Sequence, residues 1–304
     1  MIRAIRTTVF TCSIYPDLTR VWYHYLRRAV DPAAVTTVIY DCGSRLRPEH
    51  FPGARIVGSR NHDHGRKIDH FLARAETPLV FLSDDDVFLL SAEAEPFAAE
   101  ALLAAPRAAA LSFKPRGWWR LQLDGRSWPV MGSYAVIIKP EVVRREGLSF
   151  RTRPTDEPEV RAGSGYYDTA DYANRRLLEL GYEVVVPAED LRRRLVQSFA
   201  ATSSGFVGFA QRRLLSSGSY RSRRPRAAWA AALADSLPLL ERACGVAAAL
   251  HLHRRLFPEP PRFADFFTYD DLAALAETHA EPGKASAMVS GYRVLLGQLE
   301  ALAG

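Results

Sequence analysis

The sequence predicts an α/β fold built on a mostly parallel β-sheet flanked by helices, with a helical appendage at the C-terminal end. Three observations support this prediction. Between residues 7 and 113, short runs rich in β-branched and aromatic residues alternate with segments of helical periodicity. This alternation is typical of βαβ units, which build parallel sheets. Beyond residue 226, Ala- and Leu-rich helical stretches follow one another, broken by "PEPPRF".

The elements of the first part of the chain can be placed individually. We expect strands at residues 7–12, 35–40, 54–58, 79–82 and 109–113, of which the one at 79–82 should be buried. Apolar residues at i, i+3, i+4 and i+7 predict helices at 19–30 and 64–75, and an Ala-rich stretch predicts a third at 92–105. In a parallel sheet of this kind, ligands bind beyond the carboxyl ends of the strands.

The next part of the chain is less regular. A Trp-rich stretch at 117–131 suggests a hairpin, and it is followed by a strand at 134–138 and a short helix that Pro140 opens. A helix within 166–180 then leads to a strand that ends at Pro187. We expect three regions, a catalytic domain at 1–200, a flexible Ser/Gly/Arg-rich loop or lid at 201–226 and a helical region at 227–304.

The composition is that of a globular protein, with 48% apolar and 24% charged residues. No apolar run approaches the roughly 18 residues that a membrane-spanning helix needs. The cysteines Cys12, Cys42 and Cys244 are scattered and lack CxxC spacing, which disfavours disulfides and structural zinc. We therefore expect a cytoplasmic location. The basic and apolar end of the helix at 227–256 could add peripheral contact with the inner face of a membrane, and the C-terminal helices could support an oligomer.

The net charge of +6 is unevenly distributed. Residues 190–226 hold nine arginines and one acid, a local charge near +8 (9 − 1). Such a segment could meet an anionic substrate, a lipid surface or nucleic acid, and a solvated basic surface is an equal reading.

Three consecutive carboxylates, Asp84, Asp85 and Asp86, follow the apolar run "PLVFL". In an extended chain Asp84 and Asp86 would point to the same side, where two carboxylates suit a hard divalent cation that also binds phosphate. The competing reading is a solvated loop that caps the next helix. Asp41 likewise follows a strand, so both acidic positions lie where this fold binds a ligand.

Five segments, in order, resemble the nucleotide-sugar glycosyltransferases of the GT-A fold, a Rossmann-like architecture, and especially the inverting family 2. "TPLVFLSDDDVF" resembles the Asp-x-Asp (DXD) segment of that family. The other four are "TTVIYDCGSR", "RNHDHGRKIDHFLARAETPLVFL", "GSYAVIIKPEVVRREGLSF" and "YYDTADYANRRLLELGYEVVVP". Each motif alone is weak, and the match spans about residues 5–190.

The resemblance implies a nucleotide-diphosphate sugar donor, with UDP, GDP or dTDP as the nucleotide, and a divalent cation, Mn²⁺ or Mg²⁺. Asp41 would accept a hydrogen bond from the base, Asp84 would contact ribose or metal, and Asp86 would be the main metal ligand. Arg66 and Lys67 could reach phosphate, although a solvated surface is the plainer reading for each. The acceptor would be a hydroxyl on a glycan, a lipid-linked sugar or a small molecule.

Inverting transfer needs a carboxylate that takes the proton of the acceptor hydroxyl. Asp168 and Asp171 are the candidates, since both belong to the predicted helix "DTADYANRR". The sequence departs from the family here. If Asp171 is aligned with the second acid of the family motif, Thr169 falls at the position of the base. If Asp168 is aligned with the base, the spacing to Arg175 differs from that of the family by one residue. We favour Asp168 and keep Asp171 as the alternative.

A second departure concerns the metal. Family members often supply a histidine after the strand that here ends at Pro187, and this chain has none before His251. Either His251 or His253 folds back, or Asp86 and water suffice, or arginines take part of the role of the cation. Trp118 and Trp119, with Trp128, could stack on a sugar ring or fill the core.

Two other classes of function compete with the glycosyltransferase. A GT-A-like nucleotidyltransferase would carry a Gly-rich loop after the first strand, and "TCSIYPDLTR" has none. A non-catalytic basic binding module would not require the acids at 41, 84–86 and 168 in this order. We therefore expect no nucleic-acid partner.

Overall fold

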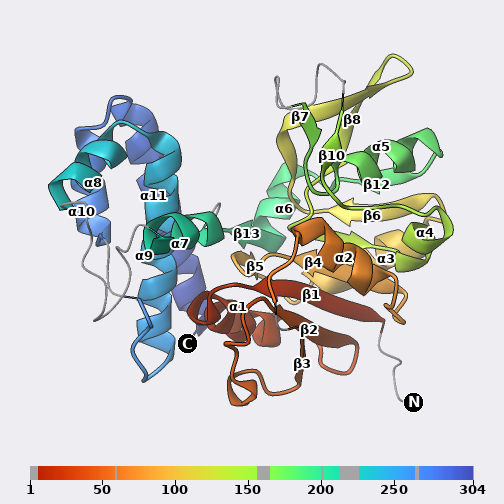
Figure 1. The fold of residues 1–304 in the computed structure, drawn as a ribbon, viewed down its shortest axis with the longest axis horizontal. Helices are drawn as coiled ribbons and strands as arrows, with labels where there is room; N and C mark the ends of the chain where they lie inside the picture. Colours follow the sequence, from red (N-terminus) through yellow and green to blue (C-terminus); the bar gives the residue numbers. More distant parts are fainter. Residues whose placement is uncertain are drawn as a thin grey trace. The chain divides into compact units, whose positions relative to one another are not determined.

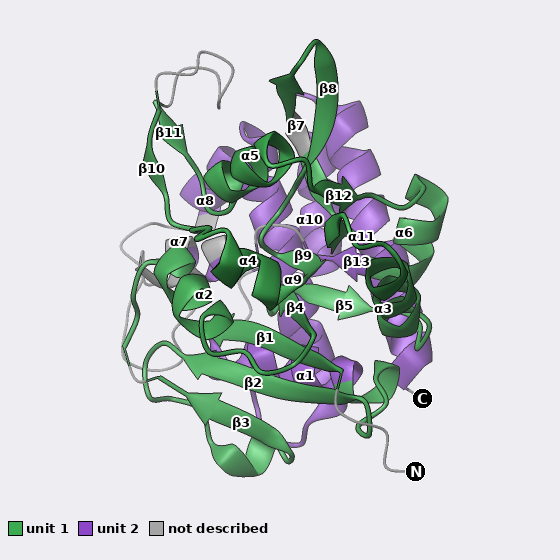
Figure 2. Ribbon diagram, turned by 90° about the vertical axis from the view of Figure 1, so that its right-hand side faces the viewer, with its two compact units in different colours: residues 1–14, 27–196 green, residues 15–26, 197–304 purple. Residues whose placement is uncertain are grey.

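The computed structural model of the chain describes residues 6–58, 60–155, 165–199, 202–211, 226–263 and 267–303 (Figure 1). For residues 117–119, 204, 207–208, 210–211 and 226 it describes the backbone alone. The chain divides into two compact units (Figure 2). Unit 1 comprises residues 1–14 and 27–196, and unit 2 comprises residues 15–26 and 197–304.

A seven-stranded sheet in the order β12-β6-β9-β4-β1-β2-β3 forms the centre of unit 1 (Figure 1). Its strands are β1 (Thr7–Ser13), β2 (Val35–Asp41), β3 (Ala54–Val57), β4 (Leu79–Ser83), β6 (Ala108–Ser112), β9 (Ala135–Ile138) and β12 (Glu183–Val185). Strand β9 runs antiparallel to both of its neighbours, whereas the other neighbouring strands are parallel. The predicted α/β class with a mostly parallel sheet is confirmed.

Helices α2 (His64–Leu72), α4 (Pro140–Arg145) and α5 (Asp171–Glu179) pack on one face of this sheet. The shared core contains Phe71 and Leu72 of α2 and Leu177 of α5 against Phe10 and Val80 of the sheet. Fully burying an apolar side chain of this size contributes about 1.5–3 kcal/mol, so this face contributes substantially to the stability of unit 1. Unit 1 also contains the helices α3 (Ala94–Ala104) and α6 (Glu189–Leu195) and a short 3-10 helix at Pro48–His50.

Short strands outside the central sheet shape the region around the Asp triplet. The predicted Trp-rich hairpin is present as β7 (Pro115–Leu123) and β8 (Arg126–Met131), which pair antiparallel. The pair β10 (Arg153–Pro154) and β11 (Tyr166–Tyr167) and the strand β5 (Val87–Leu89) were not expected, nor was helix α6. Strand β5 escaped prediction because the apolar run that follows the three carboxylates is only four residues long.

Unit 2 is helical. Its elements are α1 (Pro16–Ala29, residues 15–26 belonging to this unit), α7 (Thr202–Gln211), α8 (Arg226–Ala234), α9 (Leu237–Leu256), α10 (Tyr269–Glu277) and α11 (Pro282–Ala303), with β13 (Val196–Ser198) at its junction with unit 1. The Arg20 guanidinium of α1 lies 2.9 Å from Glu259, and the Arg262 N–H donates to Asp17. These bonds tie α1 to the C-terminal segment. Of the region expected as a loop, residues 202–211 are helical and 212–225 lie outside the described residues.

Among the described helices, none has both the length and the apolar character needed to span a bilayer.

Asn174 ties α5 to the end of β8 and leads to a first prediction. Its side chain is fully buried; it accepts from the Met131 N–H at 2.9 Å and donates to the carbonyls of Met131 and Ala170, each at 3.0 Å. An Asn174→Ala variant leaves these backbone groups buried without their partner, at about 1–3 kcal/mol per unsatisfied group. We expect the free energy of unfolding to fall by about 2–4 kcal/mol in a urea titration.

The matched control is Glu179→Ala at the exposed end of the same helix. Glu179 makes surface ion pairs with Arg175 and Arg176, which are worth about 1 kcal/mol or less. Equal destabilisation by the two substitutions would show that the buried Asn174 hydrogen bonds contribute nothing of their own.

Candidate active site at the carboxyl end of strand β4

The Asp triplet forms the turn that joins β4 to β5. The Asp84 carbonyl accepts from the Val87 N–H at 3.1 Å, which closes the turn, and the Asp84 N–H donates to the Tyr134 carbonyl at 3.0 Å. The alternation expected for an extended chain does not describe this segment, because the turn bends the backbone at Asp85 and Asp86. Both of these residues are buried, at 3% and 7% exposure.

Asp84 is crowded by protein, yet 41% of its side chain is accessible to solvent. Burial raises the pKa of its carboxyl to about 6, although Lys67 and Arg116 act in the opposite direction. Crowding by protein atoms therefore outweighs the two cations in its effect on this pKa, although the carboxyl keeps contact with solvent. A further positive charge next to Asp84 would be favourable.

His64, at the first position of α2, stands beside Asp84. Its Nε2 lies 3.9 Å from the nearer Asp84 oxygen. Burial, followed by the charge of Lys67, lowers the pKa of His64 to about 4, whereas Asp63 and Asp168 raise it. The imidazole is therefore neutral at neutral pH and could act as a nitrogen ligand or a hydrogen-bond partner.

The start of α2 is held firmly, and this positions His64. Asp63 caps the helix by accepting from the Arg66 N–H at 2.9 Å. A Cβ at Gly65 would lie 2.3 Å from the carbonyl oxygen of Phe150, so glycine permits the close approach of the helix to this segment.

Tyr134 lies close to several charged side chains of the site. Its pKa is raised by burial first, lowered by Arg116 and raised by Asp84, Asp171 and Asp86. Acids that are up to 87 positions apart in the chain therefore act on one hydroxyl. The sheet explains this, because β9 runs antiparallel to β4 with Ser83 opposite Ala135, which brings the start of β9 to the end of β4.

Arg116 of β7 organises the second acidic group. Its Nε lies 2.7 Å from Oδ1 of Asp171, its Nη2 donates to the Thr169 carbonyl at 2.6 Å, and its Nη1 lies 3.5 Å from Oδ2 of Asp168. Asp171 is fully buried, and its second oxygen accepts from the Asp168 N–H at 2.9 Å. Asp171 is thus engaged on both oxygens, whereas 29% of the Asp168 side chain is exposed.

Asp168 lies ahead of α5, which begins only at Asp171. The expectation that both acids belong to one helix is therefore wrong. The physical reason is local, since Ala170 has a φ of 74° and breaks the helical path, while the Asp171 carboxylate turns back to the Asp168 N–H. Asp168 is presented from a loop.

Asp41, at the end of β2, is 4% exposed and shapes the following loop. One of its oxygens accepts from the Gly43 N–H at 3.0 Å and the other from the Leu46 N–H at 2.9 Å. This is the bonding of an aspartate that stabilises a turn.

Arg66 and Lys67 differ in their surroundings. Arg66 is exposed on α2, whereas Lys67 is 5% exposed and donates to Asn61 Oδ1 at 2.9 Å and to Cys42 Sγ at 3.2 Å. The hydrogen-bonded Cys12 thiol, together with Lys67, lowers the pKa of Cys42 to about 7 against the effect of burial. The Lys67 ammonium is thus an internal cation that faces the strand ends.

Of the three tryptophans, Trp128 is the one whose side chain the structure describes. Trp128 packs, partly buried, against a small apolar cluster that contains Leu121 and Val130 of the hairpin. Trp118 and Trp119 lie in β7, and their side chains are outside the described part of the structure.

The two histidines of α9 have partners within unit 2. His251 Nε2 lies 2.9 Å from Glu300, and His253, 2% exposed, lies 3.7 Å from Asp17. Among the described residues, no three His, Cys, Asp or Glu side chains group closely enough to enclose a metal ion by themselves.

Sequence reasoning missed Arg116, Tyr134 and His64. Arg116 stands between Pro115 and Gly117 without any motif, and Tyr134 precedes a strand whose antiparallel placement only the sheet reveals. For His64 a signal existed, because the capped start of a helix after a third strand is a common position for ligand contacts.

No family model matches the chain, and no curated protein matches it. Solved structures do. A mannosyltransferase from Pyrobaculum calidifontis, in complex with GDP-Man and Mn²⁺, is 15% identical with a TM-score of 0.46, covering 96% of this chain and 75% of that one. A glucosyl-3-phosphoglycerate synthase from Mycobacterium tuberculosis is 16% identical with a TM-score of 0.35, covering 46% of this chain and 58% of that one.

A 2-C-methyl-D-erythritol 4-phosphate cytidylyltransferase from Thermus thermophilus is 16% identical with a TM-score of 0.38, covering 62% of this chain and 100% of that one. The similar structures thus include both glycosyltransferases and cytidylyltransferases. At TM-scores below 0.5, these likenesses leave the function to be argued from the residues of the site.

Proposed function

We propose that this chain is a metal-assisted, inverting glycosyltransferase that moves a sugar from a nucleotide-diphosphate sugar to a hydroxyl acceptor. The observation that carries the proposal is the presence of two partly accessible carboxylates, Asp84 and Asp168, that both lie close enough to His64 to act on its imidazole. His64 lies 3.9 Å from Asp84, and its pKa responds to Asp168 as well. Two acids with separate surroundings suit the two tasks of the reaction, binding the donor and accepting a proton.

Asp84 and Asp86 are the residues that would hold the cation. Mg²⁺ and Mn²⁺ prefer oxygen ligands and are often bound by one or two carboxylates together with the phosphates of the substrate, so no enclosing protein cage is required. The raised pKa of Asp84 fits a site that gains from added positive charge. When bound, the cation would stabilise negative charge on the departing nucleotide. The imidazole of His64, with its Nε2 3.9 Å from Asp84, offers a neutral nitrogen beside these carboxylates.

Asp168 is the proposed general base. A base must be reachable by the hydroxyl whose proton it takes, and Asp168 is partly exposed whereas Asp171 is buried and engaged on both oxygens. Arg116 and Asp171 hold the loop that presents Asp168. In the same proposal Asp41 shapes the wall of the donor site through its loop, and Arg66 and Lys67 supply positive charge beside it.

A nucleotidyltransferase is the competing activity, and the first strand argues against it. The residues that follow β1, Ile14 and Tyr15, lead directly into α1 without the glycine-rich loop that such an enzyme would use around a triphosphate. The two activities differ in product. A glycosyltransferase releases a nucleoside diphosphate from a nucleotide sugar, whereas a nucleotidyltransferase releases pyrophosphate from a nucleoside triphosphate.

The proposal predicts that Asp86→Asn weakens metal-supported nucleotide binding. We expect wild-type protein to be stabilised against heat by at least one of UDP, GDP, dTDP and CDP in the presence of Mn²⁺, because a ligand that binds only the folded state raises its stability. Asp86→Asn should reduce the affinity for that nucleotide about tenfold or more in calorimetry. Removing Mn²⁺ should have the same effect on the wild type.

Asp124→Asn, in the exposed turn of the β7–β8 hairpin, is the matched control. It removes an equal charge and should leave nucleotide affinity unchanged. Unaltered Mn²⁺-supported binding in a folded Asp86→Asn variant would rule out the assignment of Asp86, and absence of nucleotide binding in the wild type would reject the proposed function.

A further inference from the structure

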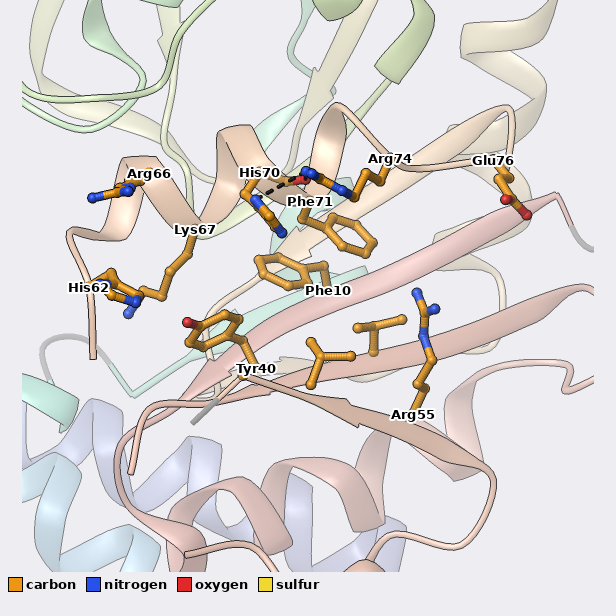
Figure 3. Close-up of a pocket in the computed structure, with 13 residues that line it drawn as sticks. Phe10, Tyr40, Arg55, His62, Arg66, Lys67, His70, Phe71, Arg74 and Glu76 are labelled. Atoms are coloured by element: carbon orange, nitrogen blue, oxygen red, sulfur yellow. Dashed lines mark hydrogen bonds between the residues drawn. The ribbon is translucent and has the colours of Figure 1, made fainter. Parts of the chain in front are cut away.

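A cavity of about 760 Å³ lies between α2 and the sheet face formed by β1, β2 and β3 (Figure 3). Its apolar wall consists of Phe10, Val38, Tyr40, Val57 and Phe71. The rings of Phe10 and Phe71 are stacked, with centroids 4.1 Å apart. The volume lies within the roughly 300–1,000 Å³ of typical small-molecule pockets, and the flat apolar wall suits an aromatic or aliphatic body.

Tyr40 is fixed in this wall. Its hydroxyl donates to the Arg60 carbonyl at 3.1 Å, and Gly58, with a φ of 82°, lies directly against its ring. A Cβ at Gly58 would come within 2.6 Å of the ring. Glycine at this position therefore keeps the ring in place and the cavity open.

The rim of the cavity is strongly basic. The charged residues that line it are the cations Arg55, Arg66, Lys67 and Arg74 and the acid Glu76, and two histidines lie beside them. Figure 3 shows Arg55 reaching from the edge strand β3 toward the side of the cavity where Arg74 and Glu76 lie. Arg74 donates to the His70 carbonyl at 3.2 Å. Within the part of the chain that the structure describes, no carboxylate pairs with the guanidinium of Arg55, Arg66 or Arg74.

This cavity is separate from the candidate active site. Asp84, Asp86 and Asp168 are not among its lining residues. Lys67 lies between the two, since it lines the cavity and its charge also acts on Asp84. Arg66, to which the proposed function gives a place beside the donor, also lines the cavity, whereas Arg55 and Arg74 have no part in the proposed reaction.

We propose that this cavity is a second ligand site, for an organic oxyanion whose apolar or aromatic body rests on the Phe10–Phe71 wall and whose phosphate, sulfonate or carboxylate group meets the arginines. Guanidinium groups bind such anions in a bidentate manner, and hydrogen bonds to charged groups are the stronger ones. The stacked rings alone would not select for an anionic group, and the arginines alone would not select for an apolar body. The inference is independent of the proposed sugar transfer.

The test uses 8-anilinonaphthalene-1-sulfonate, a fluorescent aromatic sulfonate with both required features. We expect saturable binding to the wild-type protein with one site. Because the hydrogen bonds that guanidinium groups donate to an anion are charge-assisted and strong, the double variant Arg55→Gln/Arg74→Gln should bind the dye about tenfold or more weakly. Val57→Trp, which fills the cavity from the edge strand, should also weaken binding.

Two controls make the result decisive. Arg27→Gln/Arg28→Gln removes the same charge from exposed positions at the end of α1 and should change affinity less than about twofold. Asp86→Asn should bind the dye like the wild type, because it does not line the cavity. Equal dye affinity in the Arg55/Arg74 and Arg27/Arg28 variants would overturn the proposal, as would loss of binding in Asp86→Asn alone. Neither outcome depends on nucleotide binding or sugar transfer.

Discussion

Asp168→Asn is expected to slow sugar transfer about a hundredfold or more, the usual contribution of a positioned general base. The substitution preserves size and leaves an amide that cannot take the proton of the acceptor hydroxyl. Because Asp168 stands in the loop before α5, apart from the turn at Asp84 and Asp86, the affinity for the nucleotide should stay within about twofold of the wild type. Turnover is measured by release of the nucleoside diphosphate, and affinity by calorimetry.

The control for this variant is Asp190→Asn, an exposed acid in the first turn of α6. It should transfer sugar at the wild-type rate. Undiminished turnover in Asp168→Asn would contradict its role as the base. A product that keeps the anomeric configuration of the donor would contradict inversion itself.

Asp171→Asn is expected to act on stability first. Asp171 is fully buried and lies 2.7 Å from Arg116, so the neutral amide leaves the Arg116 guanidinium without its closest counter-charge. Removing one partner of a buried pair typically costs about 3–5 kcal/mol, and we expect a loss near the lower value because Arg116 keeps its bond to the Thr169 carbonyl. The measurement is urea unfolding at neutral pH.

A double-mutant cycle with Arg116→Met separates the pair from its surroundings. If the two side chains stabilise each other, the combined loss should be smaller than the sum of the single losses by more than about 1 kcal/mol. Strict additivity would refute the coupling. Under conditions where Asp171→Asn is fully folded, its turnover should fall much less than that of Asp168→Asn, and the reverse ranking would make Asp171 the base.

The elements around the site were largely predictable because they depend on local pattern. Strands β1, β2 and β4 and helices α2 and α5 carry clear apolar periodicity, and a strand followed by acids predicts a ligand site at the edge of a parallel sheet. The sequence alone therefore determined the α/β class and drew attention to Asp84, Asp86, Asp168 and Asp171.

The relation between those acids was decided by tertiary structure. Asp168 and Asp171 are three positions apart in the sequence and equally acidic, and they are distinguished by Arg116, which reaches them from a hairpin more than 50 positions earlier. The carboxylate of Asp171 is buried and paired with Arg116, whereas that of Asp168 is partly accessible to solvent. No local pattern encodes which acid a distant guanidinium will meet.

The division of the chain was likewise decided by contacts distant in sequence. Helix α1 follows β1 closely in the chain, yet residues 15–26 group with the C-terminal part of the chain, through Arg20 with Glu259 and Asp17 with Arg262. The sequence by itself determined which segments form strands and helices, because periodicity reflects how each segment buries one face. Only the tertiary structure decided which segments share a core, which acids are paired and where the basic cavity opens, because these depend on the pairing of surfaces far apart in the chain.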